Sequence, residues 1–143
     1  MFSFNVEGIR VRYADTDQMG YVYYGNYAKF YEIGRVEAFR SLEYSYREME
    51  ESGVMMPVYE MQTKFHSPAK YDDLLTIVVK VPEMPRIRAY FEYEIYNQDG
   101  TLLNTGSTTL VFQNMSTGKL CMCPSVLLDR LKFFYSESWI AKS

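Results

Sequence analysis

The stretch "VRYADTDQMGYVYYGNYAKFYEIGRVEAF", residues 11–39, joins an acidic, glycine-punctuated loop to a long apolar segment, and it decides the fold. From residue 27 onward, apolar or small residues recur at three- and four-residue steps, which predicts a helix over residues 26–44. Gly25 and Asn26 are both candidate N-caps. Further apolar residues widen the stripe, so we expect a helix packed over much of its circumference. The recurring positions are Tyr27, Tyr31, Gly34, Ala38 and Leu42.

Outside this helix the hydrophobic period changes to two, which is typical of strands with one face in a core. Residues 4–13 alternate but change register across Gly8, which predicts a bulge or break there. The sequence "QDGT" at residues 98–101 is a hairpin signal. The other predicted strands cover residues 59–66, 75–81, 87–96, 102–114 and, after a second turn, about 120–122.

Two short segments complete the predicted order of elements. Residues 46–52 are polar and predict a turn or short helix ending at Gly53, and residues 124–134 predict a terminal helix that Ser125 can cap. A strand, a long helix, further antiparallel strands and a terminal helix make an α+β arrangement. Because one long helix cannot cover such a sheet, the uncovered strands and edges predict a homo-oligomer, most simply a two-fold dimer.

Composition bounds the classes of function. The 143 residues are 48% apolar and contain no repeat or linker, which fits one domain over residues 1–143. A formal net charge of -3 provides no basic field for a phosphate backbone, which argues against nucleic-acid binding. No window approaches the roughly 18 consecutive apolar residues of a membrane span, and the N-terminus lacks the basic-then-apolar order of a secretory signal. We therefore expect a cytoplasmic protein without membrane insertion.

Familiar catalytic and cofactor motifs are absent from the sequence. His66 is the only histidine, and no nucleophile-elbow pattern accompanies it as a Ser-His-Asp system would require. Cys121, Cys123 and His66 could form a zinc site by ligand type, but two thiols two residues apart are more typical of a core, and they do not favour a disulfide. No phosphate-binding or dinucleotide fingerprint occurs, so we expect no cofactor and no metal.

The two carboxylates Asp15 and Asp17 lie between a predicted strand and a helix N-terminus. A carboxylate there can act as a nucleophile or general base, and unsatisfied backbone N–H groups at the helix start can polarise a carbonyl oxygen. This combination suits acyl transfer. The alternative is a structural Asx turn, and the residues alone leave both possibilities open.

The same stretch resembles the signature of the 4-hydroxybenzoyl-CoA thioesterase family of hotdog-fold acyl-CoA thioesterases. The shared features are the aspartate-threonine-aspartate run, a glycine three residues on, a valine-tyrosine pair, and an asparagine-tyrosine pair entering the helix. "HSPAKYDDLLTI" and "NQDGTLLNTGSTTLVFQNMSTGKLCMCP" resemble later strands of that family. The resemblance implies the hotdog fold, an antiparallel sheet wrapped around one long central helix. It also implies dimers joined edge to edge, often paired into tetramers, with active sites at the subunit interface.

Carried onto this sequence, the resemblance makes Asp17 the catalytic carboxylate, which attacks the thioester or activates water. Backbone N–H groups around Tyr24, Gly25 and Asn26 would hold the carbonyl oxygen, and Asp15 would shape the turn. Many family members have histidine where this chain has Tyr24. A tyrosine can donate a hydrogen bond but is not a base at neutral pH, so more of the chemistry falls on Asp17.

The expected activity is hydrolysis of an acyl-CoA or aryl-CoA thioester to the free acid and CoA. Three alternatives remain: a non-catalytic hotdog domain that binds acyl-thioesters or a partner protein, a thioesterase acting on acyl carrier protein, and a hotdog dehydratase or hydratase. The last usually carries a prominent catalytic histidine, and His66 lies at the wrong place for that role. Candidate contacts to the substrate and its phosphates are Lys64, Lys70, Arg86, Arg88, Thr108 and Thr109.

Overall fold

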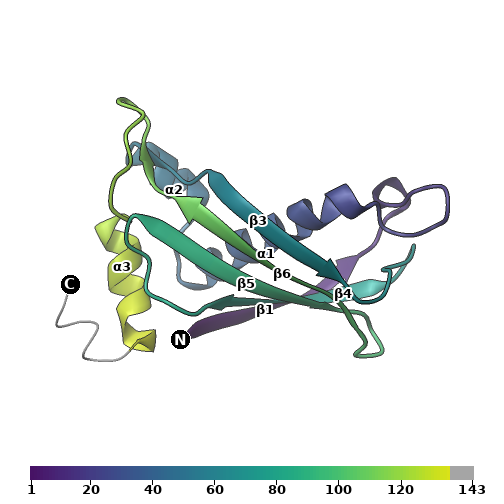
Figure 1. The fold of residues 1–143 in the computed structure, drawn as a ribbon. Helices are drawn as coiled ribbons and strands as arrows, with labels where there is room; N and C mark the ends of the chain where they lie inside the picture. The colour runs from purple at the N-terminus through teal and green to yellow at the C-terminus, as the bar shows by residue number, and fades with distance from the viewer. Residues whose placement is uncertain (136–143) are drawn as a thin grey trace.

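The computed structural model describes residues 1–135 and confirms an α+β hotdog fold (Figure 1). Its sheet has five strands in the order β1-β4-β5-β6-β3, and each neighbouring pair is antiparallel. The strands are β1 (Phe2–Arg10), β3 (Val58–Phe65), β4 (Leu74–Val81), β5 (Arg88–Tyr96) and β6 (Leu102–Val111). A separate pair joins β2 (Val54–Met55) to β7 (Gln113–Asn114). The α-helices are α1 (Tyr27–Ser41), α2 (Tyr46–Glu51) and α3 (Ser125–Leu131).

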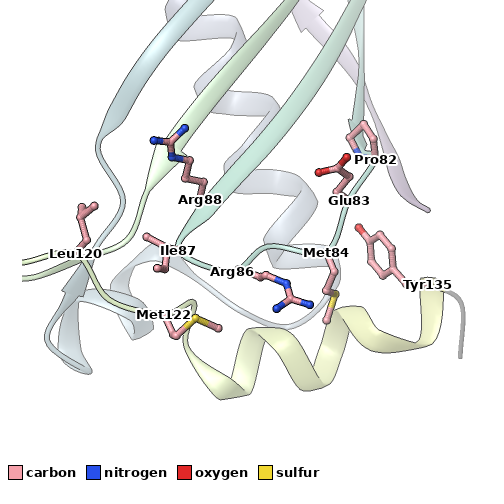
Figure 2. Close-up of a pocket in the computed structure, with 9 residues that line it drawn as sticks. All are labelled: Pro82, Glu83, Met84, Arg86, Ile87, Arg88, Leu120, Met122 and Tyr135. Carbon is pink, nitrogen blue, oxygen red and sulfur yellow. The ribbon is translucent and has the colours of Figure 1, made fainter. Parts of the chain in front are cut away.

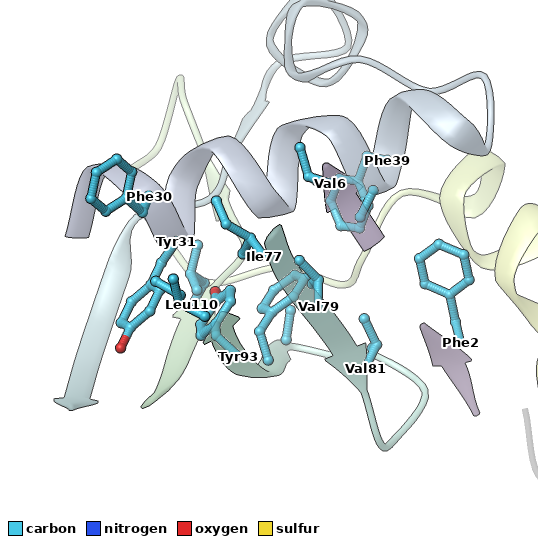
Figure 3. Packing of buried hydrophobic residues seen from close by; sticks show 14 of the residues in the cluster. Phe2, Val6, Phe30, Tyr31, Phe39, Ile77, Val79, Val81, Tyr93 and Leu110 are labelled. Atoms are coloured by element: carbon cyan, nitrogen blue, oxygen red, sulfur yellow. The ribbon is translucent and has the colours of Figure 1, made fainter. Parts of the chain in front are cut away.

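Helix α1 lies across one face of the sheet and packs mainly on β1 and β4 (Figures 1 and 3). Gly34 allows this close approach, because a Cβ atom there would lie 2.7 Å from the Val79 side chain. A mid-helix glycine costs roughly 1 kcal/mol relative to alanine, and the tight contact with the sheet explains why it is tolerated. Tyr31 then stacks on Tyr93 with ring centroids 4.2 Å apart. The expected buried helix is therefore confirmed.

A buried cation links α1 to the sheet. Arg35 is 5% exposed and donates hydrogen bonds to the hydroxyl oxygens of Tyr93, at 3.0 Å, and Tyr46, at 3.2 Å. The Tyr93 hydroxyl also lies 2.5 Å from that of Thr108 on β6. Burial raises the pKa of Tyr93 to about 12, although Arg35 acts in the opposite direction. These polar groups are satisfied by one another, as burial requires.

Several boundaries differ from the sequence prediction. Helix α1 ends at Ser41 rather than 44, and Arg130 donates hydrogen bonds to the carbonyl oxygens of Leu42 and Glu43 beyond its end. Ser125 is the first residue of α3 and not its cap, since Pro124 holds the N-cap position without a side-chain hydrogen bond.

The predicted strand at residues 120–122 is also wrong. The N–H groups of Cys121 and Cys123 donate to the carbonyl oxygens of Phe112 and Arg86 respectively. Because these acceptors lie on different segments, no ladder can form, and only an isolated bridge between Gln113 and Leu120 remains. The β1 break near Gly8 is confirmed, because the register shifts between Val6 and Ile9.

Strand β3 forms one edge of the sheet and pairs only with β6. Its side chains are largely exposed, including Val58 at 50%, Tyr59 at 64% and Phe65 at 51%. Helix α1 packs mainly on β1 and β4 (Figure 1), and although Tyr27 and Tyr31 contact Phe65 and Thr63, most of β3 remains exposed. Across residues 1–135, no helix is both long and apolar enough to cross a membrane.

Candidate active site

The loop that connects β1 to α1 folds into a tight turn that presents Asp17. The Asp17 N–H donates to the Tyr21 carbonyl oxygen at 2.7 Å, and the Gly20 N–H donates to the Asp17 carbonyl oxygen at 3.1 Å. Gly20 has a φ of 80°, a left-handed conformation that glycine adopts without strain. Asp17 Oδ1 accepts the N–H groups of Met19 at 2.9 Å and Tyr21 at 3.3 Å. The structure gives Oδ2 no hydrogen-bond donor within residues 1–135, so this oxygen can meet a ligand.

Asp17 lines a cavity of about 280 Å³ beside the start of α1. The aromatic side chains of Tyr21, Tyr24, Tyr27 and Phe65 form much of its wall. Tyr27 is 2% exposed, and its ring meets that of Phe65 edge to face at 5.2 Å. The site therefore combines a half-buried carboxylate with an aromatic wall, an arrangement suited to an apolar group attached to a reactive carbonyl.

The N-terminus of α1 offers backbone donors next to this carboxylate. A short 3-10 turn, Tyr24–Asn26, precedes the helix. The structure gives the N–H groups of Tyr24 and Gly25 no acceptor among residues 1–135, as expected for the first groups of a helical segment. The Asn26 N–H, in contrast, donates to the Tyr23 carbonyl oxygen at 2.9 Å. Of the predicted oxyanion donors, two are therefore available, and Asn26 is engaged within the turn.

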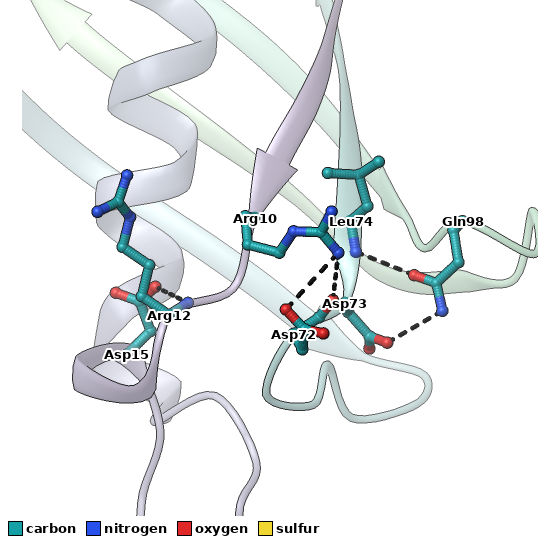
Figure 4. Close-up of polar contacts among 7 residues, drawn as sticks. All are labelled: Arg10, Arg12, Asp15, Asp72, Asp73, Leu74 and Gln98. Carbon is teal, nitrogen blue, oxygen red and sulfur yellow. Dashed lines mark hydrogen bonds and ion pairs between the residues drawn. The ribbon is translucent and has the colours of Figure 1, made fainter.

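Asp15, the first carboxylate of this loop, is buried and bonded to neighbouring groups. It is 6% exposed, and its Oδ2 accepts the Arg12 N–H at 2.9 Å (Figure 4). Its Oδ1 forms an ion pair with Lys29 on α1. Burial alone would raise the pKa of Asp15, but the hydrogen bonds from Lys29 and the Arg12 backbone hold it below its usual value. Asp15 is thus a buried anion, which agrees with the expectation that it shapes the turn.

Lys29 is the residue that the sequence analysis missed. A cation in the first turn of a helix is disfavoured by the helix dipole, and this unusual placement, with an aspartate upstream, was the available signal.

A second cluster, made by Arg10, Asp72, Asp73 and Gln98, fixes the turn before β4 rather than the cavity (Figure 4).

His66 follows β3 and borders the same cavity. Its Nε2, however, lies 2.9 Å from the Thr105 hydroxyl. Thr105 pairs with Lys64 on β3. The preceding residue on β6, Asn104, is buried against Tyr31 of α1. Because side chains alternate along a strand, Thr105 and the imidazole lie on the sheet face away from α1. Among the described residues no three His, Cys, Asp or Glu side chains could hold a metal ion.

The predicted substrate contacts do not lie together in one chain. Lys70 is nearest to Asp17, because it forms a bridge with Tyr21 in the same loop. Lys64 and Thr109 lie on the face away from α1 by the same alternation, and Thr108 is 2% exposed and bonded to Tyr93.

Arg86 and Arg88 lie at the opposite end of the sheet from Asp17. They line a hollow at the start of β5 together with Met84, Ile87 and Met122 (Figure 2), and the volume of this hollow is about 930 Å³. Strand β5 has nine residues, so about 30 Å of sheet separates them from the Asp17 end. One chain alone therefore cannot bring these arginines to Asp17.

Comparison with known proteins places this site in context. Residues 11–131 match the model of the thioesterase-like superfamily. The chain is 35% identical to the putative acyl-CoA thioesterase YneP of Bacillus subtilis over 94 residues, which cover 66% of this chain and 68% of that protein. It is 34% identical to the acyl-CoA thioester hydrolase YbgC of Escherichia coli over 103 residues, covering 72% and 77% respectively.

A solved structure agrees over nearly the whole chain. The DHNA-CoA thioesterase of Staphylococcus aureus superposes with a TM-score of 0.82 at 33% sequence identity, covering 99% of this chain and 88% of that one. The matched residues 11–131 include the Asp17 loop, α1 and every strand of the sheet except β1. The shared order of strands and helix, together with this match, shows that the chain belongs to the thioesterase-like superfamily.

Proposed function

We propose that this protein is an acyl-CoA thioesterase in which Asp17 is the catalytic carboxylate. The observation that carries the proposal is the position of Asp17: its carboxylate lines an aromatic cavity next to the free N–H groups of Tyr24 and Gly25. Relatives named as acyl-CoA thioesterases, with about one third identical residues, support the same reaction class. The 4-hydroxybenzoyl-CoA family remains a narrower prediction within it.

In the proposed reaction, the thioester carbonyl lies over the start of α1. The N–H groups of Tyr24 and Gly25, together with the positive end of the helix dipole, stabilise negative charge on the carbonyl oxygen. Asp17 either accepts a proton from the attacking water or attacks the carbonyl carbon itself. Collapse of the intermediate breaks the carbon–sulfur bond and releases the CoA thiolate, which takes up a proton. In the general-base route the attacking water becomes part of the free acid. In the nucleophilic route, loss of the thiolate leaves a mixed anhydride between Asp17 and the acyl group, and a water molecule then breaks that anhydride to release the free acid and regenerate the Asp17 carboxylate.

We also propose that the active unit is a dimer joined through β3. The free edge of β3 and its exposed apolar side chains would pair with a second copy. A two-fold axis through this edge makes the two strands antiparallel, so the Val58 end of one copy meets the Phe65 end of the other. Phe65 lines the Asp17 cavity, so the second copy would complete that cavity.

This dimer would also bring a predicted phosphate contact to the site. Val58 pairs with Leu110 on β6, and Leu110 pairs with Ala89 on β5, directly after Arg88. The Arg88 side chain already lies 5.1 Å over the Tyr59 ring on β3. In the antiparallel dimer, Arg88 of the second copy would therefore approach the cavity and could bind CoA phosphate. A dimer of dimers remains the corresponding prediction for the full assembly.

Thiol release from a panel of thioesters tests the proposed activity. Benzoyl-CoA, short-chain and long-chain acyl-CoAs, and an acyl carrier protein thioester are compared with a no-enzyme blank, and binding of each is measured separately. Release from a CoA ester well above the blank supports the thioesterase. If only the carrier-protein thioester releases thiol, the substrate is an acyl carrier protein thioester rather than a CoA ester. Tight binding with turnover no faster than the blank would instead identify a non-catalytic binding domain.

A further inference from the structure

We propose that Lys29 neutralises Asp15, so that the buried Asp15 carboxylate adds no net negative charge beside Asp17 and a thioester at the start of α1. Lys29 and Asp15 are thus a positioning pair that acts electrostatically through the site. This inference rests on the proposed role of Asp17. It goes beyond a turn-shaping role for Asp15, because it assigns the ion pair an effect on the reaction.

The contacts around Asp15 define the pair. Its buried carboxylate accepts the Arg12 backbone N–H and meets the Lys29 ammonium. The Lys29 side chain is 49% exposed, whereas that of Asp15 is 8% exposed, so solvent reaches the cation but scarcely reaches the anion. The charged groups that act on Asp15 are Lys29 from α1 and Arg12 from the loop. Within residues 1–135, Lys29 has the only side chain that hydrogen-bonds this carboxylate.

The Asp15–Lys29 pair lies close enough to Asp17 for its net charge to affect the reaction. Asp15 and Asp17 are two residues apart, so their Cα atoms are within roughly 7 Å of each other. Without Lys29, the buried Asp15 carboxylate would repel both Asp17 and the negative charge that develops on the carbonyl oxygen. The titratable side chains that border the Asp17 cavity are Tyr21, Tyr24, Tyr27 and His66, and the Asp73 carboxylate acts on Tyr27 from the turn before β4. None of the variants below changes Asp73.

Two substitutions separate this electrostatic role from a purely structural one. Lys29→Gln removes the ammonium that bonds the Asp15 carboxylate and leaves Arg12 as the remaining cation that acts on it, so kcat is expected to fall by about 3- to 30-fold with KM changed by less than about twofold. The acidic limb of the pH profile of kcat should move to higher pH, because a nearby negative charge favours protonation of Asp17. Asp15→Asn removes the negative charge instead, and kcat should stay within about threefold of the parent.

The double variant gives the sharpest comparison. Asp15→Asn combined with Lys29→Gln replaces the pair with two neutral groups and should restore kcat and the acidic limb to nearly parental values. Lys29→Arg keeps the charge and should behave like the parent. Arg40→Gln is the matched control, since it removes the cation of the exposed Glu37–Arg40 ion pair near the far end of α1. Circular dichroism and oligomeric state confirm folding of each variant.

Two results would overturn the inference. The first is a double variant no more active than Lys29→Gln, because a structural clamp would be lost in both. The second is a loss of about tenfold or more in kcat for folded Asp15→Asn, which decides the question even if Lys29→Gln does not fold. Asp17→Asn is measured alongside. If it retains parental activity the proposed function fails, whereas parental behaviour of Lys29→Gln with an inactive Asp17→Asn rejects only the role of the pair.

Discussion

Asn26 Nδ2 donates a hydrogen bond to the backbone oxygen of Asp15, 2.8 Å away. The same oxygen accepts the Tyr23 N–H at 2.9 Å. The Asp15 oxygen thus ties the start of the loop that carries Asp17 both to the end of that loop at Tyr23 and to the Asn26 side chain at the start of α1. This closure holds the carboxylate and the free N–H groups of the helix start in a fixed relation, as a reaction at a carbonyl requires.

Removal of this clamp should reduce turnover more than substrate binding. We expect Asn26→Ala to lower kcat by about 10-fold or more, since small displacements of reacting groups are costly, and to lower the free energy of unfolding by about 1 kcal/mol. Steady-state kinetics and urea denaturation measure the two effects. Asn5→Ala, an exposed asparagine on β1, is the control. A parental kcat for Asn26→Ala would show that the loop needs no clamp.

The sequence predicted the helix and the strands, because these elements depend on the local period of apolar residues. The three- and four-residue steps from Tyr27 predicted α1, and alternation predicted the main strands, because each side chain's environment repeats with the backbone. Asp17 was selected for its position between a strand and a helix. The role of the Asn26 side chain was not predicted, because its acceptor is a backbone oxygen of an irregular loop, and no residue pattern marks such an oxygen.

The sequence did not predict which face of the sheet a side chain lies on, or how far apart two residues lie along the sheet. Thr108 and Thr109 were selected together, but alternation places only Thr108 under α1, where Tyr93 engages its hydroxyl. Arg86 and Arg88 were chosen for charge alone, and strand pairing places them at the end of the sheet remote from Asp17. Such relations depend on register between strands, which pattern within one strand does not specify.

Gly106 on β6 is expected to be intolerant of substitution. A Cβ atom there would collide with the ring and hydroxyl of Tyr31, which is fully buried and stacked on Tyr93. We therefore expect Gly106→Ala to lower the free energy of unfolding by about 1–3 kcal/mol. Chemical denaturation checks this, with Ser107→Ala, whose side chain lies on the other face, as a near-neutral control. Equal stability of the two variants would contradict the described packing.

The Asp15 carboxylate should contribute stability that depends on pH. Burial opposes its charge, but Lys29 and the Arg12 N–H hold its pKa in the folded state below the ordinary 3.8. The contribution is therefore complete above that ordinary value and is lost as pH falls through the folded pKa. We expect Asp15→Asn to lower the free energy of unfolding by about 1–3 kcal/mol near pH 7, and by less near pH 3. A difference independent of pH would exclude this linkage.

The side of β3 that faces α1 should be needed for assembly. Met61 is 42% exposed at the uncovered edge, and Gln62 points to the other face of the same strand. A charge at Met61 would be buried in the proposed dimer, so Met61→Lys should yield monomers with kcat/KM reduced by at least about 10-fold. Gln62→Lys is the matched control and should stay oligomeric. Light scattering with kinetics measures both, and an oligomeric, fully active Met61→Lys would reject this interface.

The most direct test of the account is the rate of thiol release by Asp17→Asn, measured on the best substrate of the parent. The change removes the charge and keeps the size, and the N–H groups of Met19 and Tyr21 can still donate to the amide oxygen. Asp72→Asn is the control, because it removes one exposed carboxylate at a position with a φ of 71°, which asparagine tolerates. We predict that Asp17→Asn loses at least about 1,000-fold in kcat while fold, assembly and the activity of Asp72→Asn are unchanged. Parental turnover by Asp17→Asn would contradict the assignment of Asp17 as the catalytic carboxylate.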